Sequence, residues 1–400
     1  MKEQAIISKG SRLSQTAVSP IKSMSMKAEK YSNVLSLGWG LPSFETPLHI
    51  RKAVSETLFS DKDIGKYPNI RGLTSLRKAL SKKFLEKTNI ILNAESEILI
   101  TVGAQQAMLS SIISIIEPND EVILFSPFFP SYVDQIIYSG GKPVFIESIF
   151  DNNWAINIDK LKSSINNRTK AIIINTPVNP TGKIFSENEL SEIAKITIEN
   201  DLYIILDETY NFLIYETTHS YNLFSIKELK NRLIGCYSFS KEYAMTGWRI
   251  GYLCASENLI NEILKFHDAS VIAATRISQI AALAALEGEQ SCVQNFVSEL
   301  KIRRDLVRSR MDRLSDFFEF HIPNASYFFF PRLRSNIMDS TEFADDLLDK
   351  KQVIVIPGNA FGQSYNNHIR ICFGAENDTI NCAFDRIEDY FRNYYNQYQK

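Results

Sequence analysis

Apolar residues along this 400-residue chain follow one pattern from about residue 48 to residue 256 and a different one afterwards. In the first stretch, short runs of Ile, Val and Leu without polar alternation are separated by helix-like segments such as 104–116 and 186–200. Runs of this kind are typical of strands buried on both faces of a sheet. The alternation therefore predicts an α/β fold in which helices cover both faces of a mostly parallel sheet. Its seven strands are expected at 97–102, 121–125, 143–146, 171–174, 203–206, 233–237 and 250–254.

Beyond residue 257 the pattern turns helical, and after Phe317 short apolar runs return. The amphipathic stretch 296–314 carries Arg303, Arg304, Arg308, Arg310 and Arg313, which we expect on the solvated faces of a helix. Strands are expected at 317–322, 327–331, 353–356 and 368–372, and helices at 341–350 and 379–395. This α+β part, with a helix at 21–30, predicts a small second domain. The chain then divides into an N-terminal arm with part of the small domain (1–47), a large domain (48–300) and the remaining small domain (301–400).

Composition narrows the class of protein. The chain is 44% hydrophobic and 22% charged with a formal net charge of −2, which is ordinary for a globular protein and gives no sign of nucleic-acid or membrane-surface binding. No run of 18 apolar residues exists, and the first residues lack the apolar core of a signal peptide. The five cysteines, at 236, 254, 292, 372 and 382, have neither zinc-site nor disulfide-framework spacing. We therefore expect free thiols, no metal, and a cytoplasmic location.

A segment rich in reactive groups follows the strand expected at 233–237. Ser238, Ser240 and Lys241 lie within four residues, and Arg249 follows eight residues later. A lysine beside phosphate-binding groups is what an enzyme needs to form a Schiff base with pyridoxal phosphate. In that arrangement the amine bonds the aldehyde, and the two hydroxyls and the guanidinium bind the phosphate.

Three more loops follow predicted strands, where ligands bind in such folds. Gly103 permits a tight turn into a helix whose first amides, from Ala104 and Gln105, would form an anion site. An ordinary strand–helix junction would have the same residues. Asn179, in the rigid turn Asn-Pro-Thr-Gly, could donate to a phenolic oxygen of the cofactor.

Asp207 ends another expected strand, and its carboxylate could pair with a protonated pyridine nitrogen and so keep the cofactor an electron sink. Tyr210, three residues on, could donate to the phenolic oxygen. Arg370 lies in an apolar strand, where its burial is costly unless it meets an anion. A substrate carboxylate would satisfy it, and so would a structural salt bridge.

Together these segments resemble the class I/II aminotransferases, the fold-type I family of pyridoxal-phosphate enzymes that includes aspartate and aromatic aminotransferases. The resemblance extends from about Arg12 to the last helix, and its pieces occur in order. They are GLPSFETP from residue 40, YPNIRGL from 67, GAQQ from 103, NPTG from 179, DETY from 207, SFSK from 238, Arg249 and Arg370.

The resemblance implies a role for each matched residue. Lys241 is the Schiff-base lysine and moves the substrate's Cα proton, Asp207 pairs with the pyridine nitrogen, and Asn179 and Tyr210 contact the phenolic oxygen. Phe129 would stack on the ring. The phosphate would be held by Ala104, Gln105, Ser238, Ser240 and Arg249. Arg370 takes the substrate carboxylate, helped by the Gly40 amide, and Tyr67 reaches the phosphate of the neighbouring subunit, which implies a homodimer with shared active sites.

The expected activity is transfer of an amino group from an L-amino acid to a 2-oxo acid, often 2-oxoglutarate. The same scaffold also supports lyases, decarboxylases and cyclases of amino acids, and a non-catalytic ligand-sensing module is a further alternative. Phe129, the run Ala325-Ser326-Tyr327 and Thr275-Arg276 depart from the family's usual residues, which leaves substrate preference open. Arg276 is the candidate cation for a second substrate carboxylate, although a surface or interface arginine explains it as well.

Overall fold

A computed structural model describes residues 11–16, 18–216, 221–334 and 338–393. Its largest sheet has eight strands in the order β2-β9-β8-β7-β6-β3-β4-β5. The five neighbouring strands from β8 to β4 pair in parallel, while β2–β9, β8–β9 and β4–β5 are antiparallel. In that order the strands are Ile98–Thr101, Gly251–Cys254, Leu233–Ser238, Tyr203–Asp207, Thr169–Asn175, Glu121–Ser126, Lys142–Ile149 and Ala155–Ile156. The seven predicted strands are all present, and the short β5 is an addition.

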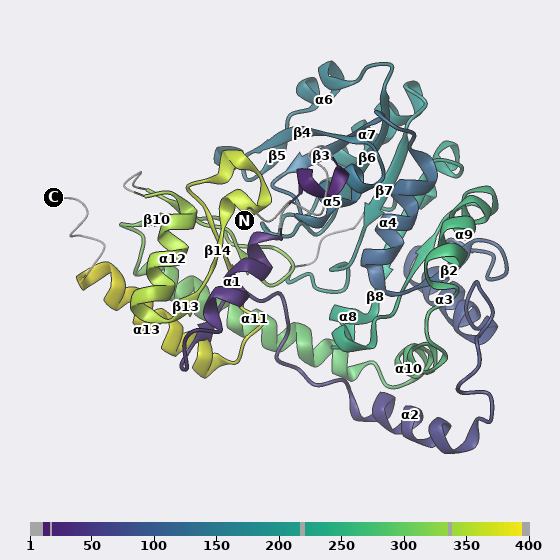
Figure 1. Ribbon diagram of the computed structural model, residues 1–400, viewed down its shortest axis with the longest axis horizontal. Coiled ribbons are helices and arrows are strands. Elements are labelled where there is room, and N and C mark those ends of the chain that lie inside the picture. The colour runs from purple at the N-terminus through teal and green to yellow at the C-terminus, as the bar shows by residue number, and fades with distance from the viewer. Residues whose placement is uncertain (1–10, 17, 217–220, 335–337, 394–400) are drawn as a thin grey trace, which may run out of the picture.

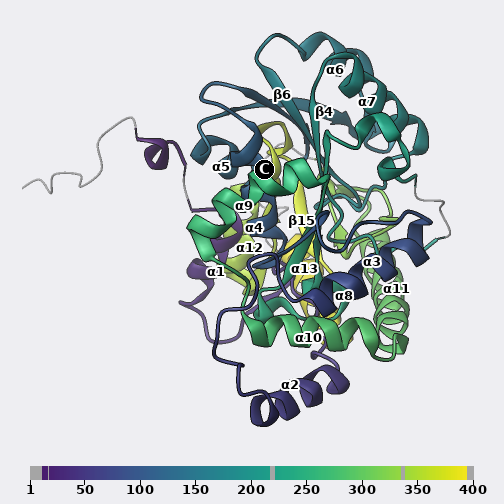
Figure 2. The ribbon, with the colours of Figure 1, turned by 90° about the vertical axis from the view of Figure 1, so that its right-hand side faces the viewer.

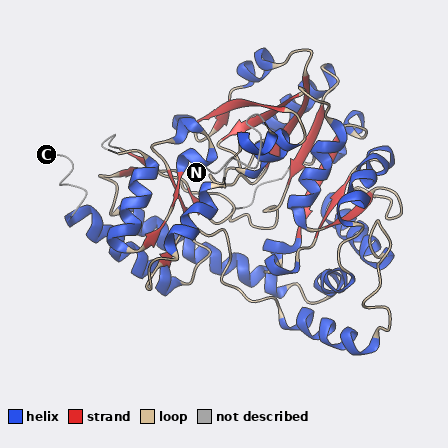
Figure 3. Cartoon of the chain, viewed as in Figure 1, coloured by secondary structure: helices blue, strands red, loops and turns tan. Residues whose placement is uncertain are grey.

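Helices cover both faces of this sheet (Figure 3). On one face, α4 (Gly103–Ile115), α5 (Ser131–Tyr138) and α9 (Glu257–Val271) share a buried core with the strands. On the other, α6 (Ile158–Ser164) and α7 (Glu187–Glu199) do so. A further core forms where α2 (Leu48–Ser60), α3 (Thr74–Thr88) and α10 (Arg276–Glu287) pack beside β2 and β9, with α2 at the edge of the molecule (Figure 2).

The first and last described helices share a separate core, on the left of Figure 1. It contains α1 (Pro20–Ala28), α11 (Ser291–Asp312), α12 (Ser340–Lys351) and α13 (Asn377–Asn393). Its strands are short: β1 (Leu35–Ser36) pairs with β13 (Val353–Ile354), β10 (Phe318–Glu319) with β12 (Arg332–Leu333), and β15 (Ile369–Cys372) with both β11 (Phe328–Phe329) and β14 (Ile356–Pro357). This core agrees with the predicted α+β small domain formed by N- and C-terminal segments. The domain borders at 47 and 300 stay predictions, and residue 300 lies within α11.

The expectation that all five arginines of the long helix face solvent was wrong. Arg308 and Arg313 are exposed, but Arg303, Arg304 and Arg310 are buried. Each buried guanidinium meets groups that are distant in sequence. Arg303 donates from Nη1 to the Ser43 hydroxyl and the Gly374 carbonyl, both at 2.8 Å, and Arg310 is paired with carboxylates of α13. Such partners offset the cost of removing a cation from water. These arginines therefore link α11 to other segments of the small domain and do not form a solvent-exposed basic face.

No helix among the described residues is long and apolar enough to cross a membrane.

Candidate active site

A cavity of about 490 Å³ lies where the carboxyl ends of the parallel strands face the small domain. It brings together twelve of the predicted residues, which are Gly40, Ala104, Gln105, Phe129, Asn179, Asp207, Tyr210, Ser238, Ser240, Lys241, Arg249 and Arg370. Gly103 lies at its edge beside Arg249, and Tyr67 is outside it. Residues from strands and loops up to 330 positions apart therefore form one polar pocket, as expected for the ligand site of such a fold.

Lys241 lies in the short helix α8 (Phe239–Glu242), which begins directly after β8. Ser238 caps this helix, and its hydroxyl accepts a hydrogen bond from the Ser240 amide at 3.0 Å. The Lys241 amine donates to the Gly40 carbonyl at 2.5 Å. Burial, with Arg370 and Arg249 nearby, lowers the pKa of Lys241 to about 8. A lysine that readily loses its proton is suited to act as a nucleophile and as a base.

An anion-binding end of the cavity is formed by the start of α4 and by Arg249. Gly103 has φ +77°, and a Cβ there would lie 2.8 Å from Nη2 of Arg249. Glycine therefore permits the guanidinium to approach the first turn of the helix. Arg249 is exposed to the cavity and is oriented by donation from Nη1 to the Thr246 carbonyl at 2.9 Å. Helix amides, two serines and this cation together match what a phosphate requires.

Asp207, the last residue of β7, lines the same cavity. Its Oδ2 accepts from the Tyr132 hydroxyl at 2.7 Å, and its Oδ1 accepts from the Thr209 amide at 2.9 Å. Burial raises the pKa of Asp207, and both hydrogen bonds act against that rise. A buried carboxylate whose pKa is raised is suited to bind a cationic ring nitrogen, since the cation would favour the ionised form of the carboxylate.

The small domain contributes Arg370, which is 1% exposed. Its Nη1 donates to Oδ1 of Asn179 at 3.1 Å and its Nη2 donates to the Gly38 carbonyl at 2.6 Å, but its Nε has no partner. No described carboxylate forms a salt bridge with it, so the structural salt bridge considered from the sequence is absent from the described residues. A buried cation without an anion is what a carboxylate-binding site requires.

Two of the predicted aromatic side chains, Tyr210 and Phe129, line the cavity. The Tyr210 ring packs edge-on against Tyr327 and Phe328, with centroids 5.4 and 5.7 Å apart. Phe129 packs against Tyr132 at 5.7 Å. The Gly40 carbonyl also accepts from the Tyr327 hydroxyl at 3.0 Å, so this turn contributes an acceptor as well as the predicted amide.

Tyr67 and Arg276 do not join this cavity. The Tyr67 side chain is 79% exposed on the segment that precedes α3. Arg276 donates from Nε to Asp61 at 2.8 Å at the start of α10. Sequence reasoning missed Tyr132 and Thr209, which hold Asp207, and also Ile21, Lys22, Leu41 and Met108, which line the walls. The position of Tyr132 in the first turn of α5, three residues after Phe129, was the available signal.

Comparison with known proteins agrees with this geometry. Residues 32–387 match the family model described as aminotransferase class I and II. The chain is 34% identical over 380 residues to an aromatic-amino-acid aminotransferase 2 of Thermococcus litoralis, with 94% of this chain and 96% of the relative covered. It is 35% identical to an aspartate aminotransferase of Pyrococcus abyssi, covering 95% and 97%.

Solved structures give the same result. An aspartate aminotransferase from Thermotoga maritima superposes with a TM-score of 0.88 at 30% identity, covering 96% of this chain and all of the other. An aromatic aminotransferase from Pyrococcus horikoshii superposes with a TM-score of 0.86 at 33% identity, covering 92% and 98%. The chain therefore belongs to the class I and II aminotransferases, which are pyridoxal-phosphate-dependent enzymes of fold type I.

Proposed function

We propose that this aminotransferase uses Lys241 as its catalytic amine and Arg370 as the receptor for the α-carboxylate of both the amino acid and the 2-oxo acid. The observation that carries the proposal is the cavity itself, in which a lysine of lowered pKa shares one pocket with a buried carboxylate and a buried guanidinium that has no carboxylate partner among the described residues. When bound there, pyridoxal phosphate takes the amino group from the donor and passes it to the acceptor.

The residues of this chain fit that cofactor. Asp207 would hold the ring nitrogen, Asn179 and Tyr210 the phenolic oxygen, and Phe129 one face of the ring. The anion-binding end would hold the phosphate through Ala104, Gln105, Ser238, Ser240 and Arg249. Arg370 and Asn179, joined at 3.1 Å, would orient the substrate so that the Cα proton faces Lys241, which removes it and returns it.

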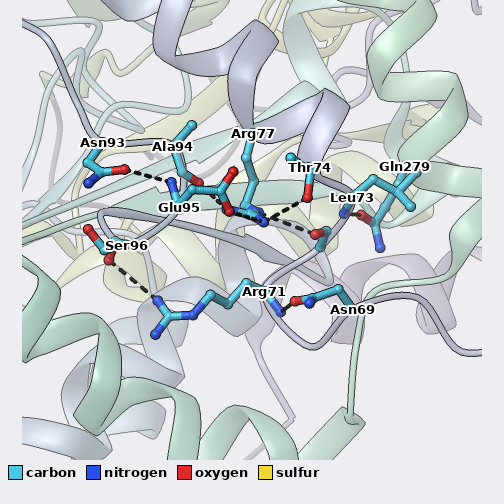
Figure 4. Close-up of polar contacts among 11 residues, drawn as sticks. Asn69, Arg71, Leu73, Thr74, Arg77, Asn93, Ala94, Glu95, Ser96 and Gln279 are labelled. Atoms are coloured by element: carbon cyan, nitrogen blue, oxygen red, sulfur yellow. Dashed lines mark hydrogen bonds and ion pairs between the residues drawn. The ribbon is translucent and has the colours of Figure 1, made fainter.

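We also propose a homodimer with shared active sites. Tyr67 is exposed on a segment that internal contacts hold in place (Figure 4), and Phe59 on the nearby helix α2 is 91% exposed. An exposed tyrosine and an exposed phenylalanine fit a surface that a partner copy covers, and Tyr67 would reach the phosphate bound by that copy. The five cysteines are free, in agreement with a reducing compartment, and we propose the cytoplasm as the location.

The test of the reaction uses purified enzyme loaded with pyridoxal phosphate and a panel of amino-acid donors. We expect conversion to the pyridoxamine form, and reversal by 2-oxoglutarate, in the wild type. Lys241→Ala should lose turnover by at least about 10³-fold, because the variant lacks the proton-transferring group. Full turnover in that variant would exclude Lys241. Release of ammonia, sulfide or CO₂ without a 2-oxo acid would instead indicate a lyase or decarboxylase.

The names of the relatives include both aromatic and aspartate aminotransferases, so similarity alone does not choose the substrate side chain. Apolar residues line part of the cavity, among them Ile21, Leu41 and Met108. An aromatic or neutral donor fits these walls. The acceptor 2-oxoglutarate has a second carboxylate, so its binding also needs a second cation.

A further inference from the structure

Four cations line the active-site cavity, and three of them have a proposed task. Lys241 is the catalytic amine, Arg249 belongs to the phosphate end, and Arg370 is the receptor for the α-carboxylate. The fourth is Lys22, from the first turn of α1. We propose that Lys22 binds the distal carboxylate of dicarboxylic substrates such as 2-oxoglutarate. This inference rests on the proposed function and names a specificity-determining residue for it.

The position of Lys22 is fixed by the packing of α1. Met24 and Ala28 bury one face of this helix in the core of the small domain, beside β13 and β14 (Figure 1). Successive helical residues are about 100° apart, so Lys22 lies on the face opposite Met24. That face is turned away from the small-domain core, and it borders the cavity together with Ile21.

Two polar contacts hold the helix in this orientation. The Trp39 indole donates to the Ser25 hydroxyl at 2.7 Å, and the Lys27 amine donates to Asp345 of α12 at 2.6 Å. The same segment that carries Trp39 continues to Gly40 and Leu41 in the cavity wall. Lys22 therefore belongs to the wall of the site and is not on a freely moving arm.

The amine of Lys22 has no carboxylate to neutralise it. No described residue accepts a hydrogen bond from Nζ of Lys22 or forms a salt bridge with it. Lys27 of the same helix differs in this respect, since it is paired with Asp345. Several other side chains that line the cavity are uncharged, including Leu41, Gln105 and Met108. Lys22 is thus the available charge for a second carboxylate in the described part of the site.

Arg276, the cation expected from the sequence, lies outside this cavity and its Nε is held by Asp61. A lysine also suits a site in which the amino-acid donor and the 2-oxo-acid acceptor have different side chains. Its long, flexible stem lets the amine meet a distal carboxylate, or turn to water while the stem packs beside an apolar substrate side chain.

The experiment compares Lys22→Met with Lys22→Arg in the loaded enzyme, using 2-oxoglutarate and 4-methyl-2-oxopentanoate as alternative acceptors. For Lys22→Met we expect KM for 2-oxoglutarate to rise by about tenfold or more, which is the usual scale for loss of one charge-assisted hydrogen bond. KM for the neutral acceptor should change less than about twofold, and Lys22→Arg should restore most of the selectivity. Lys30→Met, an exposed lysine just after α1, is the matched control.

Binding of glutarate by calorimetry gives a second readout without turnover, and Lys22→Met should weaken it by a similar factor. The proposal is overturned if 2-oxoglutarate and glutarate bind Lys22→Met as they bind the wild type, or if both acceptors lose affinity equally. Loss of dicarboxylate selectivity in Arg276→Met alone would assign the role to Arg276. Absence of transamination by the wild type with any donor would instead refute the proposed function.

Discussion

Asp207 owes its orientation to Tyr132. The tyrosine is 3% exposed and donates to Oδ2 at 2.7 Å, which opposes the rise in the pKa of Asp207 that burial causes. In Tyr132→Phe the carboxylate loses this donor, so its pKa should rise further and protonation should occur at higher pH. Because a protonated Asp207 binds a cationic ring nitrogen poorly, we expect cofactor affinity to fall about tenfold at neutral pH.

The measurement is the dissociation constant of pyridoxal phosphate between pH 5.5 and 8.5. The acid-side loss of affinity should move to higher pH in Tyr132→Phe, since less acid is then needed to protonate Asp207. Tyr365→Phe is a suitable control, because Tyr365 is also buried and donates to a backbone carbonyl, that of Ser126, at 2.8 Å. An unchanged pH profile in Tyr132→Phe would show that the tyrosine only fills space.

At the scale of elements, the segment between Tyr67 and α3 is held by Arg77, as Figure 4 shows. This arginine is 2% exposed, donates from Nε to the Gly72 carbonyl at 3.3 Å and is paired with Glu95 at 3.0 Å. Gly72 has φ +97°, and a Cβ there would lie 2.2 Å from Ile100, so the turn has little freedom to rearrange. The segment is therefore rigid where it leads to Tyr67.

Arg77→Met should leave the Gly72 and Ala94 carbonyls without their donor. We expect a loss of about 2–4 kcal/mol in the free energy of unfolding, since one buried and one partly buried acceptor lose their hydrogen bonds. Denaturant unfolding measures the loss. Lys82→Met is the control, because its pair with Glu86 on α3 is exposed and such pairs contribute at most about 1 kcal/mol. Equal stability of the two variants would contradict a structural role for the Arg77 contacts.

For the molecule as a whole, the sequence predicted best what depends on local pattern. Strand ends can be located from runs of apolar residues, so Asp207 and Lys241 were found, and so was Arg370 in its apolar strand. Tyr132 was missed because its partner Asp207 is 75 residues away. Arg303 was misassigned for the same reason, since Ser43 and Gly374 are distant in the chain. Contacts between segments that are distant in the sequence can be located only in the folded structure.

A dimer with shared sites predicts complementation between two impaired variants. Tyr67→Phe keeps Lys241 but loses the hydroxyl that would reach the partner's phosphate, and Lys241→Ala keeps that hydroxyl but loses the amine. In a hybrid dimer one site combines Lys241 of the first variant with Tyr67 of the second, and is complete.

Mixing the two variants under conditions that exchange subunits should therefore raise activity above the sum of the separate preparations. Random reassociation gives half hybrids with one complete site each, so the mixture should approach roughly a quarter of wild-type activity. Mixing Lys241→Ala with Lys241→Met is the control and should give no gain. If Tyr67 served the site of its own subunit, every site in the hybrid would lack one group, and the mixture would show only the residual activity of Tyr67→Phe.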